Sequence, residues 1–140
     1  MRNYKLIEKI PTAKELSELR ILVGWGIPNE KDLKIGLDNS LYGVCVFSEE
    51  NIIGTARVIG DKSTCFYIQD VIVHPEHQRK GIGLSIMKKI MSYIGENACH
   101  EAIVGLMSAK GKENFYEKFG FWTRPTEHFG PGMIQFWKKE

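Results

Sequence analysis

The feature that most constrains this chain is a glycine-containing turn, Gln-Arg-Lys-Gly-Ile-Gly at residues 78–83, between a strand-like run and a helix-like run. Residues 67–73 are rich in β-branched and aromatic side chains, which favours a strand. From Leu84 to Ile94 the apolar residues recur at helical spacing. Glycines at a strand-to-helix turn leave backbone N–H groups at the helix N-terminus open to an anion. We therefore expect a phosphate-bearing ligand at this turn.

Two familiar phosphate-binding turns are excluded by spacing. A P-loop requires Gly-Lys-Ser/Thr at its end, whereas residues 83–85 read Gly-Leu-Ser. A dinucleotide fingerprint requires a glycine three residues after Gly83, where Ile86 stands. A turn that merely joins strand to helix explains neither the adjacent bases Arg79 and Lys80 nor the spacing from Pro75.

The remaining pattern predicts one domain, residues 1–140, built on a mixed sheet. Thr12 and Glu15 form a capping box that begins the first helix. Three central strands are expected to form an antiparallel meander. We expect strands at residues 4–9, 42–47, 52–59, 64–73, 101–106, 121–122 and 133–137, and helices at 12–22, 30–39, 84–95 and 113–119.

Composition narrows the classes of function. With 140 residues, 43% of them hydrophobic, the chain is long enough for one core and short for two domains. A formal net charge of +2 gives no case for nucleic-acid binding. No apolar run reaches membrane-spanning length and the N-terminus lacks a signal-peptide pattern, so we expect a cytoplasmic protein without a membrane partner. The three cysteines suit neither a disulfide framework nor a metal site, and we expect Cys45 and Cys65 in the core.

The segment from Asp70 to Gly83 resembles the acetyl-CoA-binding motif of the GNAT superfamily of N-acetyltransferases. It has an apolar strand, then Val-x-Pro at residues 73–75, then Gln-x-x-Gly-x-Gly and a long helix. The resemblance covers most of the chain and implies the GNAT fold, of α/β (α+β) class. That fold has a mixed central sheet, with splayed fourth and fifth strands, flanked by about four helices.

The resemblance implies acetyl-CoA as cofactor and no metal. The pantetheine arm is expected along the end of the fourth strand, held by backbone groups, with the pyrophosphate over the glycine turn. Arg79 and Lys80 either contact phosphates or remain solvated. The implied cofactor-binding residues are Val71, Ile72, Val73, Gln78, Arg79, Lys80, Gly81, Ile82, Gly83 and Leu84.

Two catalytic roles follow from the resemblance. Residues 116–121 match the family's Tyr-x-x-x-Gly-Phe segment, whose tyrosine commonly acts as general acid, so Tyr116 takes that role. A phenol is protonated at neutral pH and can donate to a leaving thiolate. The alternative is that Tyr116 is a core aromatic. The backbone N–H of Val71 is the expected oxyanion donor.

The general base is less determined. Many relatives use a glutamate in the fourth strand, and the matching position here is Tyr67. Residues 68–73 resemble the Ile-Glu-Asp-x-x-Val of glucosamine-6-phosphate N-acetyltransferases, with Gln69 in place of the glutamate. Asp70 either binds the substrate ammonium, accepts its proton through water, or bonds neighbouring backbone N–H groups. A water chain to bulk solvent is a further alternative.

Substrate-binding candidates are Trp25, Arg57, Asp70 and His128. Trp25 either lines the acceptor pocket or fills a glycine-rich loop. Arg57 either neutralises an acidic acceptor or forms an ordinary ion pair. Residues 129–137, which are rich in aromatic side chains, are a candidate homodimer interface.

The resulting prediction is an acetyl-CoA-dependent N-acetyltransferase that transfers the acetyl group directly to a primary amine in a ternary complex. The leading acceptor is a small-molecule amine, and a protein or peptide amine stays open. The alternative from another class is a non-catalytic acyl-CoA-binding or sensing module. An RNA-modifying enzyme would need a basic face that a net charge of +2 does not suggest.

Overall fold

The computed structural model describes residues 3–139. The chain divides into two compact units, Met1–Met107 and Ser108–Glu140, each described below by itself. The expectation of a single domain stays a prediction. In the described part of the chain, no helix is both long and apolar enough to cross a lipid bilayer.

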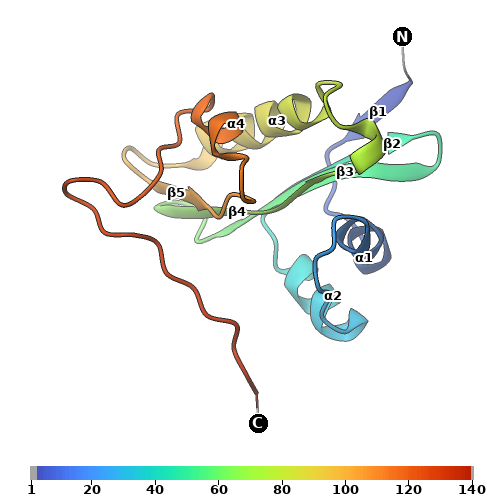
Figure 1. The fold of residues 1–140 in the computed structure, drawn as a ribbon, viewed down its shortest axis with the longest axis horizontal. Coiled ribbons are helices and arrows are strands. Elements are labelled where there is room, and N and C mark those ends of the chain that lie inside the picture. The colour runs from blue at the N-terminus through green and yellow to red at the C-terminus, as the bar shows by residue number, and fades with distance from the viewer. Residues whose placement is uncertain (1–2, 140) are drawn as a thin grey trace. The chain divides into compact units, whose positions relative to one another are not determined.

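A mixed five-stranded sheet forms the centre of the first unit (Figure 1). Its strands lie side by side in chain order: β1 (Tyr4–Ile7), β2 (Tyr42–Ser48), β3 (Asn51–Gly60), β4 (Cys65–Val73) and β5 (Ile103–Leu106). The first three pairings are antiparallel and the β4–β5 pairing is parallel. The predicted mixed sheet and its antiparallel centre are confirmed.

Helices cover both faces of this sheet. The pair α1 (Ala13–Leu22) and α2 (Glu30–Asp38) lies on one face, and α3 (Ile82–Asn97) lies on the other (Figure 1). A short 3₁₀ turn, η1 (Pro75–His77), connects β4 to the segment before α3. The fourth helix, α4 (Glu113–Glu117), belongs to the second unit.

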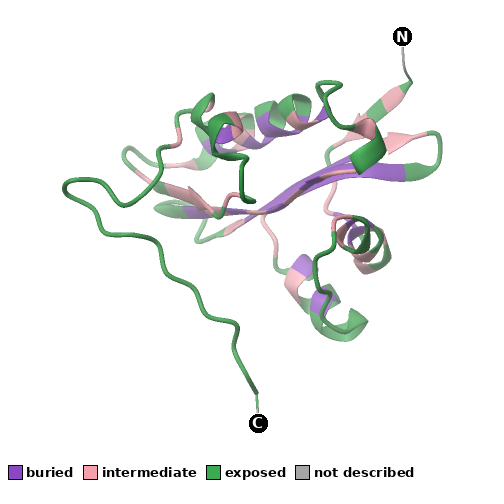
Figure 2. Ribbon diagram, viewed as in Figure 1, coloured by how far each residue is buried: buried purple, intermediate pink, exposed green. Residues whose placement is uncertain are grey.

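The N-terminal end of α3 approaches the sheet closely at Gly54 of β3. A Cβ atom on Gly54 would lie 3.0 Å from Ile86 Cδ1 and 3.2 Å from Ile82 Cγ2. Glycine therefore makes room for the first turns of α3, whose apolar side is buried on the sheet (Figure 2). This packing fixes the start of α3 beside the end of β4, because Gly54 pairs with Val73.

A β-bulge in β4 changes the face of the sheet to which the following side chains point. Thr55 pairs with Ile72 and Arg57 with Gln69, so β4 has one more residue than β3 between these pairs. Before the bulge, the ring of Phe66 contacts Tyr93 of α3. After it, Ile72 belongs to the buried cluster under α1 and α2. A regular strand would place residues 66 and 72 on the same face, so the extra residue causes the change.

Two expectations from the sequence are wrong. The predicted strands at 121–122 and 133–137 do not form, because residues 121–139 are neither helix nor strand in the described chain. An apolar run becomes a strand only when a neighbour supplies hydrogen-bond partners. Cys65 is exposed rather than buried, since it is the first residue of β4.

Candidate active site

The edge of β4 opens where β5 ends. β5 pairs with β4 only from Cys65 to Ile68, and no described residue pairs with the later part of β4 on that side. On the other side, the His74 N–H donates to the Ile53 carbonyl at 2.7 Å, so residue 74 faces β3. Alternation along a strand then turns the backbone groups of Val73 and Val71 towards the open side. These groups are where an extended ligand with amides could bind.

The bulge determines the direction of the Val71 N–H. Asp70 has a φ of 57°, in the left-handed region that few residues other than glycine adopt. It is the additional residue of the bulge, so Val71 lies opposite Ala56 at the point where pairing becomes irregular. The Val71 N–H therefore lies at a break in the sheet, next to the end of β5, where the sequence resemblance placed an oxyanion donor.

The turn after β4 leaves a helix N-terminus without a side-chain cap. Gly81 is the N-cap of α3, with a φ of 84°, and no side chain bonds the first N–H groups of the helix. In an α-helix these groups have no intrahelical partner. A Cβ on Gly81 would find no heavy atom within 4 Å, so open space adjoins them. This arrangement suits an anion such as a pyrophosphate.

The side-chain amide of Gln78 bonds to the end of β4 and stabilises this turn. Its Nε2 donates to the Val73 carbonyl oxygen at 3.0 Å, which ties the turn to the end of β4. The Val73 carbonyl therefore already accepts one hydrogen bond from the protein. Arg79, which also has a positive φ of 63°, is exposed.

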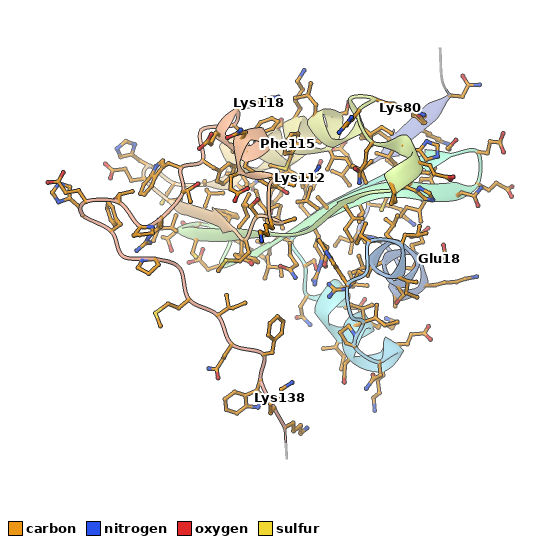
Figure 3. All side chains as sticks on the ribbon, in the orientation of Figure 1. Glu18, Lys80, Lys112, Phe115, Lys118 and Lys138 are labelled. Carbon is orange, nitrogen blue, oxygen red and sulfur yellow. The ribbon has the colours of Figure 1, made fainter. Side chains whose placement is uncertain are left out.

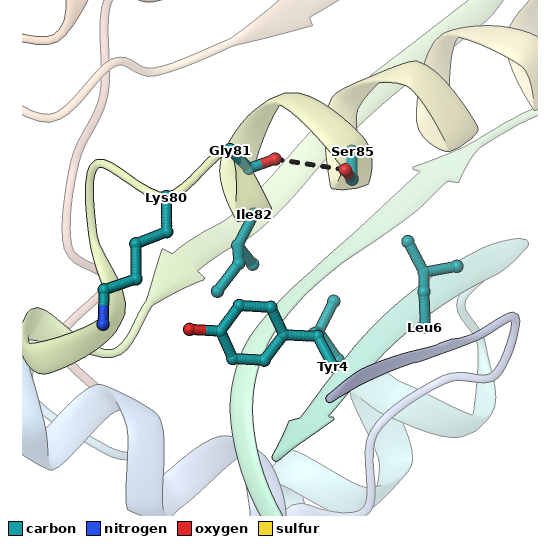
Figure 4. Close-up of a pocket in the computed structure, with 7 residues that line it drawn as sticks. Tyr4, Leu6, Lys80, Gly81, Ile82 and Ser85 are labelled. Atoms are coloured by element: carbon teal, nitrogen blue, oxygen red, sulfur yellow. Dashed lines mark hydrogen bonds between the residues drawn. The ribbon is translucent and has the colours of Figure 1, made fainter. Parts of the chain in front are cut away.

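A small cavity lies beside the turn, between α3 and the first two strands (Figure 4). Its volume is about 160 Å³, below the range of roughly 300–1,000 Å³ typical of pockets for whole ligands. Lys80 lines it and donates from Nζ to the Glu76 carbonyl at 3.4 Å. This cavity is too small for coenzyme A, so the open edge of β4 is the candidate cofactor site.

Asp70 is held between two arginines. Arg20 Nη1 donates to one carboxylate oxygen at 2.6 Å, and Arg57 Nε donates to the other at 2.9 Å. Asp70 is buried, with 5% of its surface exposed. Each carboxylate oxygen of Asp70 thus already has a charged partner. A bond from Asp70 to substrate or to neighbouring backbone would have to form beside these two arginines.

The same arginines connect the bulge to the helix pair. Arg20 Nε donates to the Gly26 carbonyl at 2.8 Å, and its guanidinium lies over the Trp25 ring. Arg57 Nη1 contacts the Ser40 hydroxyl at 3.0 Å. Trp25, Arg57 and Asp70, predicted separately from the sequence, therefore belong to one cluster. Arg20 was missed, because a basic residue in the last turn of a helix is common and gives no signal of a partner fifty residues away.

Tyr116 is buried in the second unit, with its ring edge-on to those of Phe115 and Phe121. Figure 3 labels Phe115 and Lys112 at the start of this helix. Burial raises the pKa of the Tyr116 hydroxyl, which keeps it protonated and able to donate. Its role as general acid stays a prediction.

Three further titratable groups have surroundings that bear on acid–base chemistry. Burial, followed by the charge of Asp70, raises the pKa of Tyr67. Burial raises the pKa of the Cys45 thiol to about 11. His128 is exposed in the second unit, with Nε2 3.9 Å from a Glu127 oxygen. Among residues 3–139, no three His, Cys, Asp or Glu side chains are grouped to hold a metal ion.

Comparisons with known proteins identify the family of the chain. Residues 10–121 match the family described as "Acetyltransferase (GNAT) family". An uncharacterized N-acetyltransferase ycf52 of Gracilaria tenuistipitata var. liui is 33% identical over 115 residues, covering 79% of this chain and 62% of the relative. The chain thus matches less than two thirds of that relative's length. A glucosamine 6-phosphate N-acetyltransferase of Schizosaccharomyces pombe is 34% identical over 98 residues, covering 59% and 80% of the two chains.

The fold has a solved counterpart in a probable acetyltransferase from meticillin-resistant Staphylococcus aureus. The TM-score is 0.87 at 33% identity, and the match covers 96% of this chain and 100% of the other. The chain belongs to the GNAT acetyltransferase family.

Proposed function

We propose that this chain is an acetyl-CoA-dependent N-acetyltransferase that transfers the acetyl group directly to a primary amine of a small molecule. The observation that carries the proposal is the bulge at Asp70 and Val71, where a backbone N–H faces the open edge of β4. Beside it lies the uncapped N-terminus of α3. Family membership makes acetyl-CoA the expected donor.

The residues of the first unit fit the two ends of such a donor. The Val71 and Val73 N–H groups would bond the amides of the pantetheine arm, in the manner of a strand added to a sheet. Because the Val73 carbonyl already accepts from Gln78, we expect the arm to bond first to the Val73 N–H. The N–H groups of residues 82–84 would receive the pyrophosphate.

The reaction requires few groups from the protein. Acetyl-CoA, when bound, would supply a thioester, and its C–S bond would break as the amine nitrogen formed a bond to the acetyl carbon. The Val71 N–H would donate to the carbonyl oxygen as negative charge develops there. The Tyr116 hydroxyl would donate its proton to the departing sulfur and regain one from water, to which the amine would release its own proton.

The proposal of a small-molecule acceptor draws on a relative. The yeast relative, 34% identical over its matched region, is named as a glucosamine 6-phosphate N-acetyltransferase, whose acceptor is a small amine. In this chain the loop between α1 and α2 is fixed to the bulge by Arg20, which supports a wall on the acceptor side. We expect amines of metabolite size to be preferred over peptides.

The test combines cofactor binding with turnover. Acetyl-CoA affinity is measured by calorimetry, and release of coenzyme A is followed by chromatography with amino sugars, amino acids, polyamines and peptides. Tyr116→Phe is expected to lower kcat by about 10²- to 10⁴-fold without weakening acetyl-CoA binding. Tyr93→Phe removes the same hydroxyl from a half-buried tyrosine of α3 and serves as the control.

Two results would change the assignment. Tight acetyl-CoA binding without turnover on any amine would indicate a non-catalytic acyl-CoA-binding module. Turnover that Tyr116→Phe leaves unchanged would remove the general acid from the mechanism while keeping the enzyme. A clear preference for peptides would replace the small-molecule acceptor.

A further inference from the structure

Asp70 combines three properties. It is a buried carboxylate, its backbone is left-handed within a strand, and both carboxylate oxygens accept hydrogen bonds from guanidinium groups. Backbone strain of this kind persists only where the surroundings fix it. The strain here lies one residue before the N–H expected to stabilise the oxyanion.

We propose that Asp70 is a positioning residue, whose clamp by Arg20 and Arg57 holds the bulge and thereby aims the Val71 N–H. This inference rests on the proposed function. It assigns Asp70 no contact with the reacting atoms. The carboxylate acts through the backbone, because its two ion pairs keep residue 70 at a φ of 57°.

The clamp argues against the other roles considered for Asp70. Each oxygen is bonded to an arginine, so a substrate ammonium or a transferred proton would have to displace a guanidinium. Two arginines and one carboxylate also leave the cluster with an excess positive charge, which would repel a cationic amine. The cluster suits support of the backbone better than binding of the acceptor nitrogen.

The two arms of the clamp come from different elements. Arg57 of β3 is anchored by the Ser40 hydroxyl after α2, and 10% of its side chain is exposed. Arg20 of α1 is anchored by the Gly26 carbonyl, and 19% of its side chain is exposed. The bulge is therefore held from β3 and from the α1–α2 loop together. Movement of that loop would displace Arg20, and with it Asp70 and the neighbouring Val71 N–H.

Two substitutions separate the clamp from the backbone conformation. Asp70→Asn keeps the size and the tolerance of a left-handed φ but loses the charge. Asp70→Gly adopts that φ without strain but has no side chain to clamp. We expect both to lower kcat by up to about 100-fold, the loss that a small misplacement of reacting groups can cause. The KM of the amine and the acetyl-CoA affinity are expected to change by less than about threefold, because neither ligand contacts Asp70.

The matched control is Asp38→Asn. Asp38 accepts from Lys34 Nζ at 2.6 Å, the same distance as the Arg20 contact, but this pair is exposed on α2. The control is expected to leave kcat unchanged. If Asp70→Asn does not fold, Arg20→Lys tests the clamp instead. It alters the more exposed of the two arginines while keeping the positive charge.

A second readout needs no turnover. The amide resonance of Val71 in the ¹H–¹⁵N spectrum is expected to shift in Asp70→Gly and Arg20→Lys, and to stay in place in Asp38→Asn. Wild-type kcat in Asp70→Gly, or an unmoved Val71 resonance in Arg20→Lys, would overturn the clamp. If the wild-type chain acetylates no amine, the proposed function fails, and the resonance alone then decides whether the clamp holds the bulge.

Discussion

Gly81 has a left-handed backbone conformation and lies at the expected phosphate site. Its φ of 84° is strained for any residue with a Cβ, and the space beside it is open. Gly81→Ala should therefore destabilise the fold by roughly 1–2 kcal/mol through backbone strain alone. It should also weaken acetyl-CoA binding, because the new methyl group projects beside the open N–H groups.

A second glycine in the same helix provides the control for this prediction. Gly95 lies exposed inside α3, and a Cβ there would meet nothing within 4 Å. Gly95→Ala should stabilise the fold by about 0.5–1 kcal/mol, because alanine loses less backbone freedom in a helix. Urea denaturation of both variants measures the difference. Equal effects at the two positions would contradict the left-handed turn.

At the scale of elements, α1 begins as the sequence predicted. The Glu15 N–H donates to the Thr12 hydroxyl at 3.1 Å, and the Thr12 N–H donates to a Glu15 carboxylate oxygen at 2.9 Å. The prediction of the capping box is confirmed, because both partners lie within four residues and need no tertiary contact. Since α1 carries Arg20, the stability of this helix supports one arm of the clamp.

Thr12→Ala should cost about 1 kcal/mol of unfolding free energy, because the Glu15 N–H loses its acceptor. Ser17→Ala, in the middle of the same helix, should change stability by only a few tenths of a kcal/mol in the favourable direction. Denaturation curves of the two variants test this pair. If Thr12→Ala costs no more than Ser17→Ala, the cap does not contribute to the fold.

At the scale of the whole molecule, the C-terminal segment leaves large apolar side chains in water. Met133, Phe136 and Trp137 are 88%, 80% and 79% exposed. Large apolar side chains that are exposed close together in the chain are candidates for an interaction surface. The homodimer expected from the sequence stays a prediction, with a second copy of this chain as the partner.

Sedimentation velocity over a range of concentrations measures that association. The double variant Phe136→Ser, Trp137→Ser should shift the chain towards monomer, because it removes the two exposed rings. Lys138→Ser, Lys139→Ser changes the neighbouring exposed positions without removing apolar surface and should leave association unchanged. A wild-type chain that sediments as a monomer at every concentration would contradict the homodimer.

The sequence by itself determined the features whose causes are local or periodic. The helical spacing of apolar residues predicted α3, and alternation predicted the central strands. The glycines of residues 78–83 predicted the turn that leads into the helix. Resemblance over that segment also led to the GNAT family, which the comparisons confirm. The predicted strand at 133–137 is absent because an apolar run forms a strand only when a partner strand is available.

Only the tertiary structure decided what surrounds Asp70. Its arginine partners lie fifty and thirteen residues away in the chain, and no local pattern relates them. The bulge that separates Phe66 from Ile72 likewise arises from pairing with β3 and leaves no trace in composition. Long-range ion pairs and strand register depend on which elements meet in space. The glycine turn could therefore be predicted from the sequence, whereas the two arginine contacts of Asp70 could not.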